Sequence, residues 1–228
     1  TYTPNQDFNG TDSFTFTVSD GDLSDDASVT LTIDAVNDAP VLATVSDVSF
    51  DEDGSGSTSL SANDVDGDSL EFSISGGDQI TASLSGSDVT FGAPADYNGS
   101  ETFTVSVTDG SETDSQSITV TVNAVNDAPV LSSVGDRETS EDETLNILLS
   151  AFDVEGDQLS FSVLGGEQIV ATLSGNELTL TPSQNFYGSE LFTVSVSDGD
   201  LSNSEVFTLT VNAVNDAPVL ATVSDVSF

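Results

Sequence analysis

Phe103-Thr104-Val105-Ser106-Val107-Thr108-Asp109-Gly110 is the stretch that decides the fold of this chain. Apolar side chains alternate in it with Ser and Thr, and the alternation resumes beyond the Asp-Gly turn signal in residues 118–122. A period of two is typical of a β-strand with one face on a core and one face in water. Asp-Gly suits a hairpin turn. The stretch therefore predicts paired strands, and no segment shows a helical stripe of comparable strength.

The same pattern occurs three times along the 228 residues, at a constant spacing of 89. Phe14 and Phe192 are the counterparts of Phe103, and the hexapeptide Ala-Val-Asn-Asp-Ala-Pro occupies 35–40, 124–129 and 213–218. A period of this length indicates small domains joined in tandem. We predict the C-terminal part of a repeat at 1–37, complete repeats at 38–126 and 127–215, and the N-terminal strand of a further repeat at 216–228. Because the outer segments are incomplete repeats, we expect the chain to be part of a longer protein.

Each complete repeat predicts an all-β fold of seven short antiparallel strands. In the second complete repeat the strands are expected near 129–137, 144–150, 158–164, 168–174, 177–181, 190–197 and 204–213. Seven strands separated by turn signals in under 100 residues favour an immunoglobulin-like β-sandwich. The chain has no Cys and no Trp, which excludes a disulfide-bridged antibody-type domain. We expect the sandwiches to follow one another end to end as a rod.

The charge balance excludes several classes of partner and activity. The chain has 40 acidic residues and one basic residue, for a formal charge of −39. Nucleic acids and anionic membrane surfaces require Lys and Arg, so neither is expected as a partner. No apolar run approaches the roughly 18 residues that span a bilayer, so no membrane insertion is expected in this segment. Without His or Cys the common nucleophile–base arrangements are missing, and we expect no enzyme.

Comparison of the copies separates recurring acids from scattered ones such as Asp26, Glu71 and Glu205, which have no acidic counterpart. The recurring carboxylate and amide side chains stand in the loops and in the Asn-Asp-Ala-Pro peptide, here called the joint. They are the predicted metal ligands: Asp7, Asp12, Asp20, Asn37, Asp38, Glu52, Asp53, Asp64, Asp66, Asp68, Asp96, Glu101, Asp109, Asn126, Asp127, Glu141, Asp142, Asp153, Glu155, Asp157, Asn185, Glu190, Asp198, Asn215 and Asp216.

Counting strands assigns these ligands to two ends of each repeat. The upstream pole combines the preceding joint with the loops at 64–68 and 109–112, or 153–157 and 198–201 in the next repeat. The downstream pole combines the loops at 52–53 and 96–101, or 141–142 and 185–190, with the following joint. In an end-to-end array, downstream and upstream poles of neighbours meet. Two carboxylates about 4 Å apart repel by roughly 4 kcal/mol at an effective dielectric near 20, so such a cluster demands cations.

The chemistry of these ligands favours one metal. Hard oxygen donors in excess, without His or Cys, select calcium over transition metals, and magnesium prefers fewer protein ligands. We expect roughly two or three calcium ions at each joint, because each ion takes about 6–8 oxygens. Asn185 stands where the other copies have Asp7 and Asp96, so a weaker or differently filled site is expected at the third joint.

Three motifs carry a resemblance to a known family: the joint, the loop Asp64-Val65-Asp66-Gly67-Asp68, and the peptide at residues 2–14. Together they resemble the bacterial cadherin-like tandem repeats of large surface adhesins. The resemblance implies calcium clamped between successive sandwiches, neighbouring repeats of the same chain as partners, and a secreted protein at the cell surface. The joint is also similar to the linker of animal cadherins, but Ala39 and its counterparts stand where that linker often has a further Asn.

Several interpretations stay open beside the calcium-stiffened extender that carries an adhesive domain. Surface acidity is also typical of proteins from salty habitats, which need no specific site. A self-assembling extracellular filament, with the repeats as its surface, is the first functional alternative. An array that binds carbohydrate is the second, although the chain has no Trp and only 3 Tyr for stacking on sugars.

Overall fold

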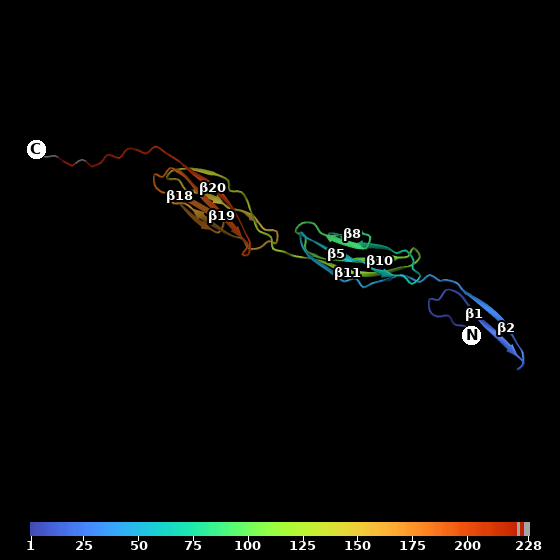
Figure 1. Cartoon of the computed structure of the whole chain (residues 1–228). Coiled ribbons are helices and arrows are strands. Elements are labelled where there is room, and N and C mark those ends of the chain that lie inside the picture. The colour runs from blue at the N-terminus through green and yellow to red at the C-terminus, as the bar shows by residue number, and fades with distance from the viewer. Residues whose placement is uncertain (223, 226–228) are drawn as a thin grey trace. The chain divides into compact units, whose positions relative to one another are not determined.

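The computed structural model describes residues 1–222, 224 and 225. Within this part of the chain every regular element is a β-strand (Figure 1), which confirms the all-β prediction. Consequently, no helix among the described residues is long and apolar enough to cross a membrane. The chain forms two compact units, residues 1–125 and the remainder from Asn126 onward.

The N-terminal segment is a hairpin. Strands β1 (Gly10–Ser19) and β2 (Ser24–Ile33) pair in antiparallel register, with Phe14 opposite Val29. Asp20 and Gly21 lie in the turn between the strands, as the Asp-Gly signal predicts. The apolar face of this hairpin is exposed, with Phe16 at 58% and Val18 at 69% of full accessibility.

The first complete repeat contains two main sheets and one small one. The larger sheet has the order β4 (Val48–Asp51), β11 (Thr113–Asn123), β10 (Gly99–Thr108) and β7 (Glu71–Gly76). The second sheet has the order β5 (Ser55–Ser59), β9 (Asp88–Gly92) and β8 (Thr81–Ser85). A short pair joins β3 (Val41–Leu42) to β6 (Ala62–Asn63).

The second complete repeat has the same organisation. Its larger sheet has the order β13 (Arg137–Ser140), β20 (Ser202–Asn212), β19 (Gly188–Ser197) and β16 (Ser160–Gly165). The facing sheet has the order β14 (Leu145–Leu148), β18 (Glu177–Pro182) and β17 (Ile169–Ser174). The short pair is β12 (Val130–Leu131) with β15 (Ala151–Phe152). The described residues beyond Asn212 form no strand, and 223 and 226–228 of the strand predicted at 216–228 lie outside the described residues.

The prediction of one strand over 129–137 is wrong. The structure divides this region into β12 and β13, which belong to different sheets, and β13 pairs in parallel with β20. The break falls at Gly135, which adopts a positive φ of 62°. There the Glu205 carboxylate accepts the N–H groups of Val134 and Gly135, at 2.8 and 3.1 Å, in place of a strand partner. The strand predicted at 144–150 contains β14, and β15 is a further short strand just beyond it, so the repeat has nine short strands instead of seven.

The core of each repeat lies between its two sheets and follows the period-two pattern. In β10 the buried side chains are Phe103, Val105 and Val107, each at most 1% exposed. Their counterparts in β19 begin with Phe192, and all are fully buried. Burying a side chain of this size stabilises the fold by roughly 1.5–3 kcal/mol. The core therefore fixes the strands from which the polar loops at both poles emerge.

Candidate metal sites at the repeat poles

The upstream pole of the first complete repeat brings three distant segments together. The Asn37 side-chain amide of the joint donates a hydrogen bond to Oδ2 of Asp109, in the β10–β11 turn, at 3.0 Å. The N–H of Asp38 donates to Oδ2 of Asp66, in the loop before β7, at 2.8 Å. The joint, this loop and the turn thus lie at one end of the sandwich, as strand counting predicts.

The loop at this pole is organised around Asp64. Its Oδ1 accepts the N–H groups of Asp66, Gly67 and Asp68 at 3.0, 3.0 and 3.2 Å. Gly67 supplies the positive φ of 80° that the tight turn needs. The turn brings the carboxylates of Asp64, Asp66 and Asp68 close together, with one oxygen of each within 4.8 Å of the others. The other oxygen of Asp64 is buried and has no hydrogen-bond partner among the described residues.

The upstream pole of the second complete repeat repeats this arrangement. Asn126 donates to Oδ2 of Asp198 at 2.9 Å, and Oδ1 of Asp153 accepts the N–H of Asp157 at 3.0 Å. The N–H of Asp127 lies 3.4 Å from Oε2 of Glu155. Asp153 is only 6% exposed, and its Oδ2 is buried without a hydrogen-bond partner in the described part of the chain.

In each turn aspartate, one of the two carboxylate oxygens stabilises the turn by accepting hydrogen bonds. Oδ1 of Asp20, Asp109 and Asp198 accepts two N–H groups of its own turn. The Asn126 amide, followed by the turn N–H of Leu201, holds the pKa of Asp198 below its usual value. In Asp109 the N–H of Glu112 lowers the pKa first and Asn37 adds to it. Hydrogen bonds to the ionised form thus keep both groups charged and oriented.

The downstream poles are built around two buried glutamates. Glu52 and Glu141 are each 6% exposed. Oε1 of each accepts the N–H of the residue just before the joint at 2.5 Å, from Val125 and Val214 respectively. Their own N–H groups donate to the last residue of β11 and of β20 at 2.9 Å. These contacts attach the peptide that leaves the sandwich to the loop after β4 or β13.

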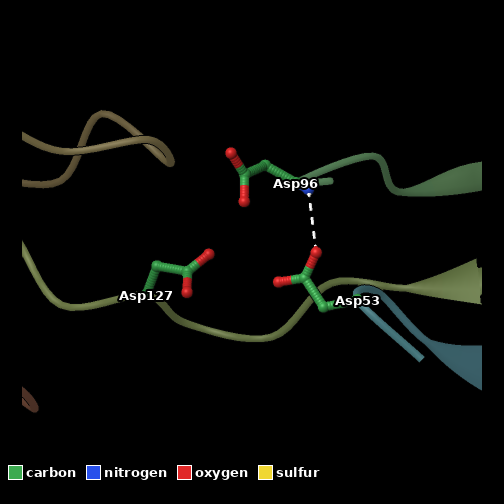
Figure 2. Close-up of side chains that lie close together, drawn as sticks. All are labelled: Asp53, Asp96 and Asp127. Carbon is green, nitrogen blue, oxygen red and sulfur yellow. Dashed lines mark hydrogen bonds between the residues drawn. The ribbon is translucent and has the colours of Figure 1, made fainter. Parts of the chain in front are cut away.

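Asp53 and Asp96 face each other at the downstream pole of the first complete repeat (Figure 2). The N–H of Asp96 lies 3.4 Å from Oδ1 of Asp53, and both residues adopt positive φ, 57° and 60°. Figure 2 also shows Asp127, on the peptide that follows β11. In the next repeat Asp142 accepts the N–H of Asn185 at 3.1 Å.

Glu101 and Glu190 have a different role in the structure. The Glu101 carboxylate accepts the N–H groups of Asp78, Gln79 and Ile80 at 2.7, 2.9 and 3.1 Å. Glu190 accepts those of the equivalent residues 167–169 at 2.8–3.2 Å. The bond from Gln79, followed by that from Asp78, lowers the pKa of Glu101. Since these oxygens hold the turn before β8 or β17, we leave both glutamates out of the ligand set proposed below.

The predicted ligands in the outer segments are less enclosed. Asp7 has a positive φ of 60°, as Asp96 has, and Asp12 accepts a hydrogen bond from the Tyr2 hydroxyl at 2.8 Å. At the other end, the Asn215 amide donates to the carbonyl of Asp216 at 3.3 Å. All of these side chains are exposed.

The predicted ligand set left out further recurring acids, among them one pair that contacts the last strand of its repeat. Asp47 and Asp136 stand 89 residues apart. Each accepts the N–H of a residue in the last strand of its repeat, Thr119 at 2.8 Å and Thr208 at 2.7 Å. The spacing of 89 was the signal that could have identified them. These contacts attach the segment just before β4 or β13 to the last strand of the repeat, so the two aspartates do not lie at a pole.

The donor set at the poles fits a hard divalent cation. Carboxylate, amide and carbonyl oxygens are the ligands that calcium prefers. The single basic residue, Arg137, acts on Glu205, whose pKa it helps to lower, and contributes to no pole. The buried oxygens of Asp64 and Asp153 therefore lack a positive neighbour from the protein, and a buried carboxylate without one is costly.

The fold and the poles together define a tandem array of immunoglobulin-like β-sandwiches. The chain belongs to the bacterial Ig domain family, which matches it over residues 1–32, 37–122 and 126–213. Domains of this family are typically extracellular, non-enzymatic structural modules. A search of curated protein sequences found no significant match.

Solved structures with a similar fold include cadherin repeats. Human protocadherin-24 EC1-2 (form II) has a TM-score of 0.50 and 18% identity, with 80% of this chain and 100% of that chain covered. Drosophila N-cadherin EC1-3 has a TM-score of 0.35 and 13% identity, over 90% of this chain and 78% of that one. An endo-fucoidan hydrolase from glycoside hydrolase family 107 has a TM-score of 0.35 and 22% identity; 91% of this chain is covered, which spans 34% of the hydrolase. At these identities the likeness is one of fold alone.

Proposed function

We propose that this segment is part of the extender of a large secreted bacterial surface adhesin, in which calcium ions at the joints stiffen the array. The extender would carry an adhesive domain away from the cell. The family supports a tandem, extracellular, structural role. The calcium part of the proposal goes further and depends on the chemistry of the poles.

One observation carries the proposal: the Asp153 carboxylate is 6% exposed and has an oxygen with no hydrogen-bond partner in the described chain. Asp64, at the same position of the preceding repeat, has a buried oxygen in the same condition. An unpaired buried carboxylate normally takes up a proton or binds a metal. Its neighbours in the loop are further acids, which suit a cation.

The ligand set that we propose for the upstream pole combines the acids of the loop with the aspartate of the turn. In the first complete repeat it contains Asp64, Asp66, Asp68 and Asp109. In the second it contains Asp153, Glu155, Asp157 and Asp198. The downstream pole adds Asp53 and Asp96, or Asp142 and Asn185, and Oε2 of Glu52 or Glu141. Several acids that would repel one another across a joint would instead share ions.

Small-angle X-ray scattering of the 228-residue chain tests the stiffening. We expect a larger maximum dimension, and a narrower distribution of dimensions, in millimolar calcium than in EDTA. Magnesium at the same ionic strength is the control for screening, since screening alone acts equally for both cations. Identical profiles in calcium, magnesium and EDTA would contradict a stiffening role even if calcium binds.

The second candidate function is a filament whose repeats form the assembly surface. One observation favours it: the second complete repeat exposes several large apolar side chains that the first does not have, among them Leu164 and Leu191. A growth of particle mass with protein concentration would support this function, and it is compatible with calcium at the joints.

A further inference from the structure

The outer face of the sheet β13-β20-β19-β16 differs from every equivalent face in the described chain. Leu164 on β16, Leu191 on β19 and Val206 on β20 are exposed at 72%, 64% and 59%. The first complete repeat has Ser75, Thr102 and Ser117 at these positions, and all three are exposed. The N-terminal hairpin has Ser13 and Ser28 at the two positions that it contains.

The three apolar residues form one patch. Leu164 pairs with Thr193 on the neighbouring strand, and Thr193 pairs with Val206 on the strand beyond. Paired residues of a sheet point to the same side, so the two apolar side chains flank Thr193 in one row. Leu191 lies two residues before Thr193 on β19 and therefore points to the same side. We call these three residues and Thr193 the outer patch.

The outer patch lies on three strands whose outward side chains carry no charge. The residues of β16, β19 and β20 that alternate with the buried ones are Ser, Thr, Asn, Leu and Val. On the edge strand β13, Glu138 shares this side of the sheet, since it pairs with Thr210. The first complete repeat instead carries Glu71 on β7, where the second has Ser160. For a chain with a formal charge of −39 this is an unusual surface.

We propose that the outer patch is a self-association surface, at which two copies of this chain pack their second complete repeats face to face. Two copies repel wherever their acidic surfaces meet, and this face brings no carboxylates of the three strands into opposition. Its arrangement is also self-complementary. A two-fold axis through Thr193 places Leu164 of one copy against Val206 of the other, as an isologous contact requires.

The size of the face sets the strength of the contact. Three strands spaced about 4.8 Å apart, with about ten residues rising 3.3 Å each, present roughly 450 Å² per copy. The total of about 900 Å² lies below the usual range for stable complexes, so the contact is weak and transient. We expect a dissociation constant on the order of 10⁻⁴ M. In a long protein with several such repeats, multivalency would strengthen the lateral contact.

Sedimentation equilibrium tests the proposal with the full chain, at concentrations from about 10 μM to 1 mM, which bracket the expected constant. High salt is chosen to screen the net charge. The test variant combines Leu164→Ser, Leu191→Thr and Val206→Ser, which are the residues of the first repeat. The control combines Leu148→Ser and Val170→Thr, a change of the same type at two positions of the opposite sheet, where the side chains are 75% and 59% exposed.

We expect the average mass of the wild-type chain and of the control to rise toward a dimer, and the test variant to stay monomeric. The reciprocal variant, Ser75→Leu with Thr102→Leu and Ser117→Val, should associate more than wild type. Unchanged circular dichroism verifies folding, since exposed substitutions of this kind have small effects on stability. A wild-type chain that stays monomeric throughout, or a test variant that associates equally, overturns the proposal. The measurement is repeated in EDTA and in calcium, so its outcome is separate from that of the calcium proposal.

Discussion

The two complete repeats share a core and differ on their surfaces. Phe103 and Phe192 are at most 1% exposed at equivalent positions, and the sheets that hold them have the same order. On the surface, Asp96 is replaced by Asn185 and Gln116 by Glu205. Packing therefore constrains the sandwich, whereas the polar side chains at the poles and on the outer face differ between the repeats. The similarities identify the fold, and the differences are where the two repeats can differ in binding.

The largest expected effect concerns the shared core. Phe192→Ala removes a fully buried ring that lies 5.7 Å from the Phe207 ring, centroid to centroid. We expect a loss of about 3–5 kcal/mol in the free energy of unfolding of the second repeat. Urea unfolding in EDTA measures it. Leu191→Ala, one residue earlier but 64% exposed, is the control and should change stability by no more than about 0.5 kcal/mol. Equal losses for the two variants would contradict the assigned strand orientation.

Two glycines with similar backbone angles should respond differently. Gly166 and Gly175 have φ of 84° and 62°. A Cβ at Gly166 would clash with the carbonyl of Ile169 and lie 2.9 Å from the Phe192 ring, whereas at Gly175 nothing lies within 4 Å. We expect Gly175→Ala to cost roughly 1–2 kcal/mol through the backbone alone, and Gly166→Ala to cost more because overpacking adds about 1–3 kcal/mol. Thermal unfolding of both variants decides this order.

Exchanging the residue types at the downstream poles should exchange their affinities for calcium. Asp96 and Asn185 have the same conformation, with φ of 57° and 58°. Asn185→Asp adds a carboxylate without changing the backbone, and we expect roughly tenfold tighter binding at that pole, because ligand charge tunes affinity. Asp96→Asn should weaken the first pole by a similar factor. Calorimetric titration measures both affinities. If neither substitution changes the affinity for calcium, the residue at this position is not a ligand.

The smallest expected effect is the part of the pH dependence that Glu205 contributes to the stability of the second repeat. The N–H of Val134, then Ser133 and Gly135, lower the pKa of Glu205 in the folded state. The ionised form therefore stabilises the fold above the ordinary pKa of about 4.3, and this contribution is lost as pH falls through the lower, folded value. Glu205→Gln should make the unfolding free energy of this repeat less dependent on pH below about 5.

The first repeat provides the control for that measurement. It has Gln116 at the same position, whose side chain holds the N–H and carbonyl of Val45 at 3.1 and 2.6 Å without a titratable group. Gln116→Glu should introduce into the first repeat the acid sensitivity that Glu205→Gln removes from the second. If neither exchange alters how the unfolding free energy depends on pH, the role proposed for the Glu205 and Gln116 side chains is contradicted.

Much of the fold follows from local pattern. The alternation around Val105 and Val194 places the buried face correctly, because a strand has only two faces. The division of 129–137 into two strands did not follow, because it depends on Glu205, 70 residues after Gly135, reaching two N–H groups of the break. Contacts between residues so distant in the chain leave no local signal.

The sequence predicts which residues lie at the poles, but not the hydrogen bonds that each of them makes. Recurrence at 89 residues identifies the acids, and strand counting brings Asn37 to Asp109. The sequence pattern does not distinguish an acid whose oxygens accept hydrogen bonds from backbone N–H groups from an acid with a buried oxygen that accepts none. Glu101 and Asp153 look equivalent in sequence, and only their hydrogen bonds separate them.

The central claim is that buried carboxylates at the upstream poles bind calcium. Its most direct test is calorimetric titration of calcium into the metal-free chain, with Asp64→Asn and Asp153→Asn together as the test variant and the exposed Glu71→Gln as a charge control. We predict saturable binding by wild type and by the control, and loss of sites in the double variant. Equal binding by all three proteins, or none by the wild type at millimolar calcium, would contradict the account.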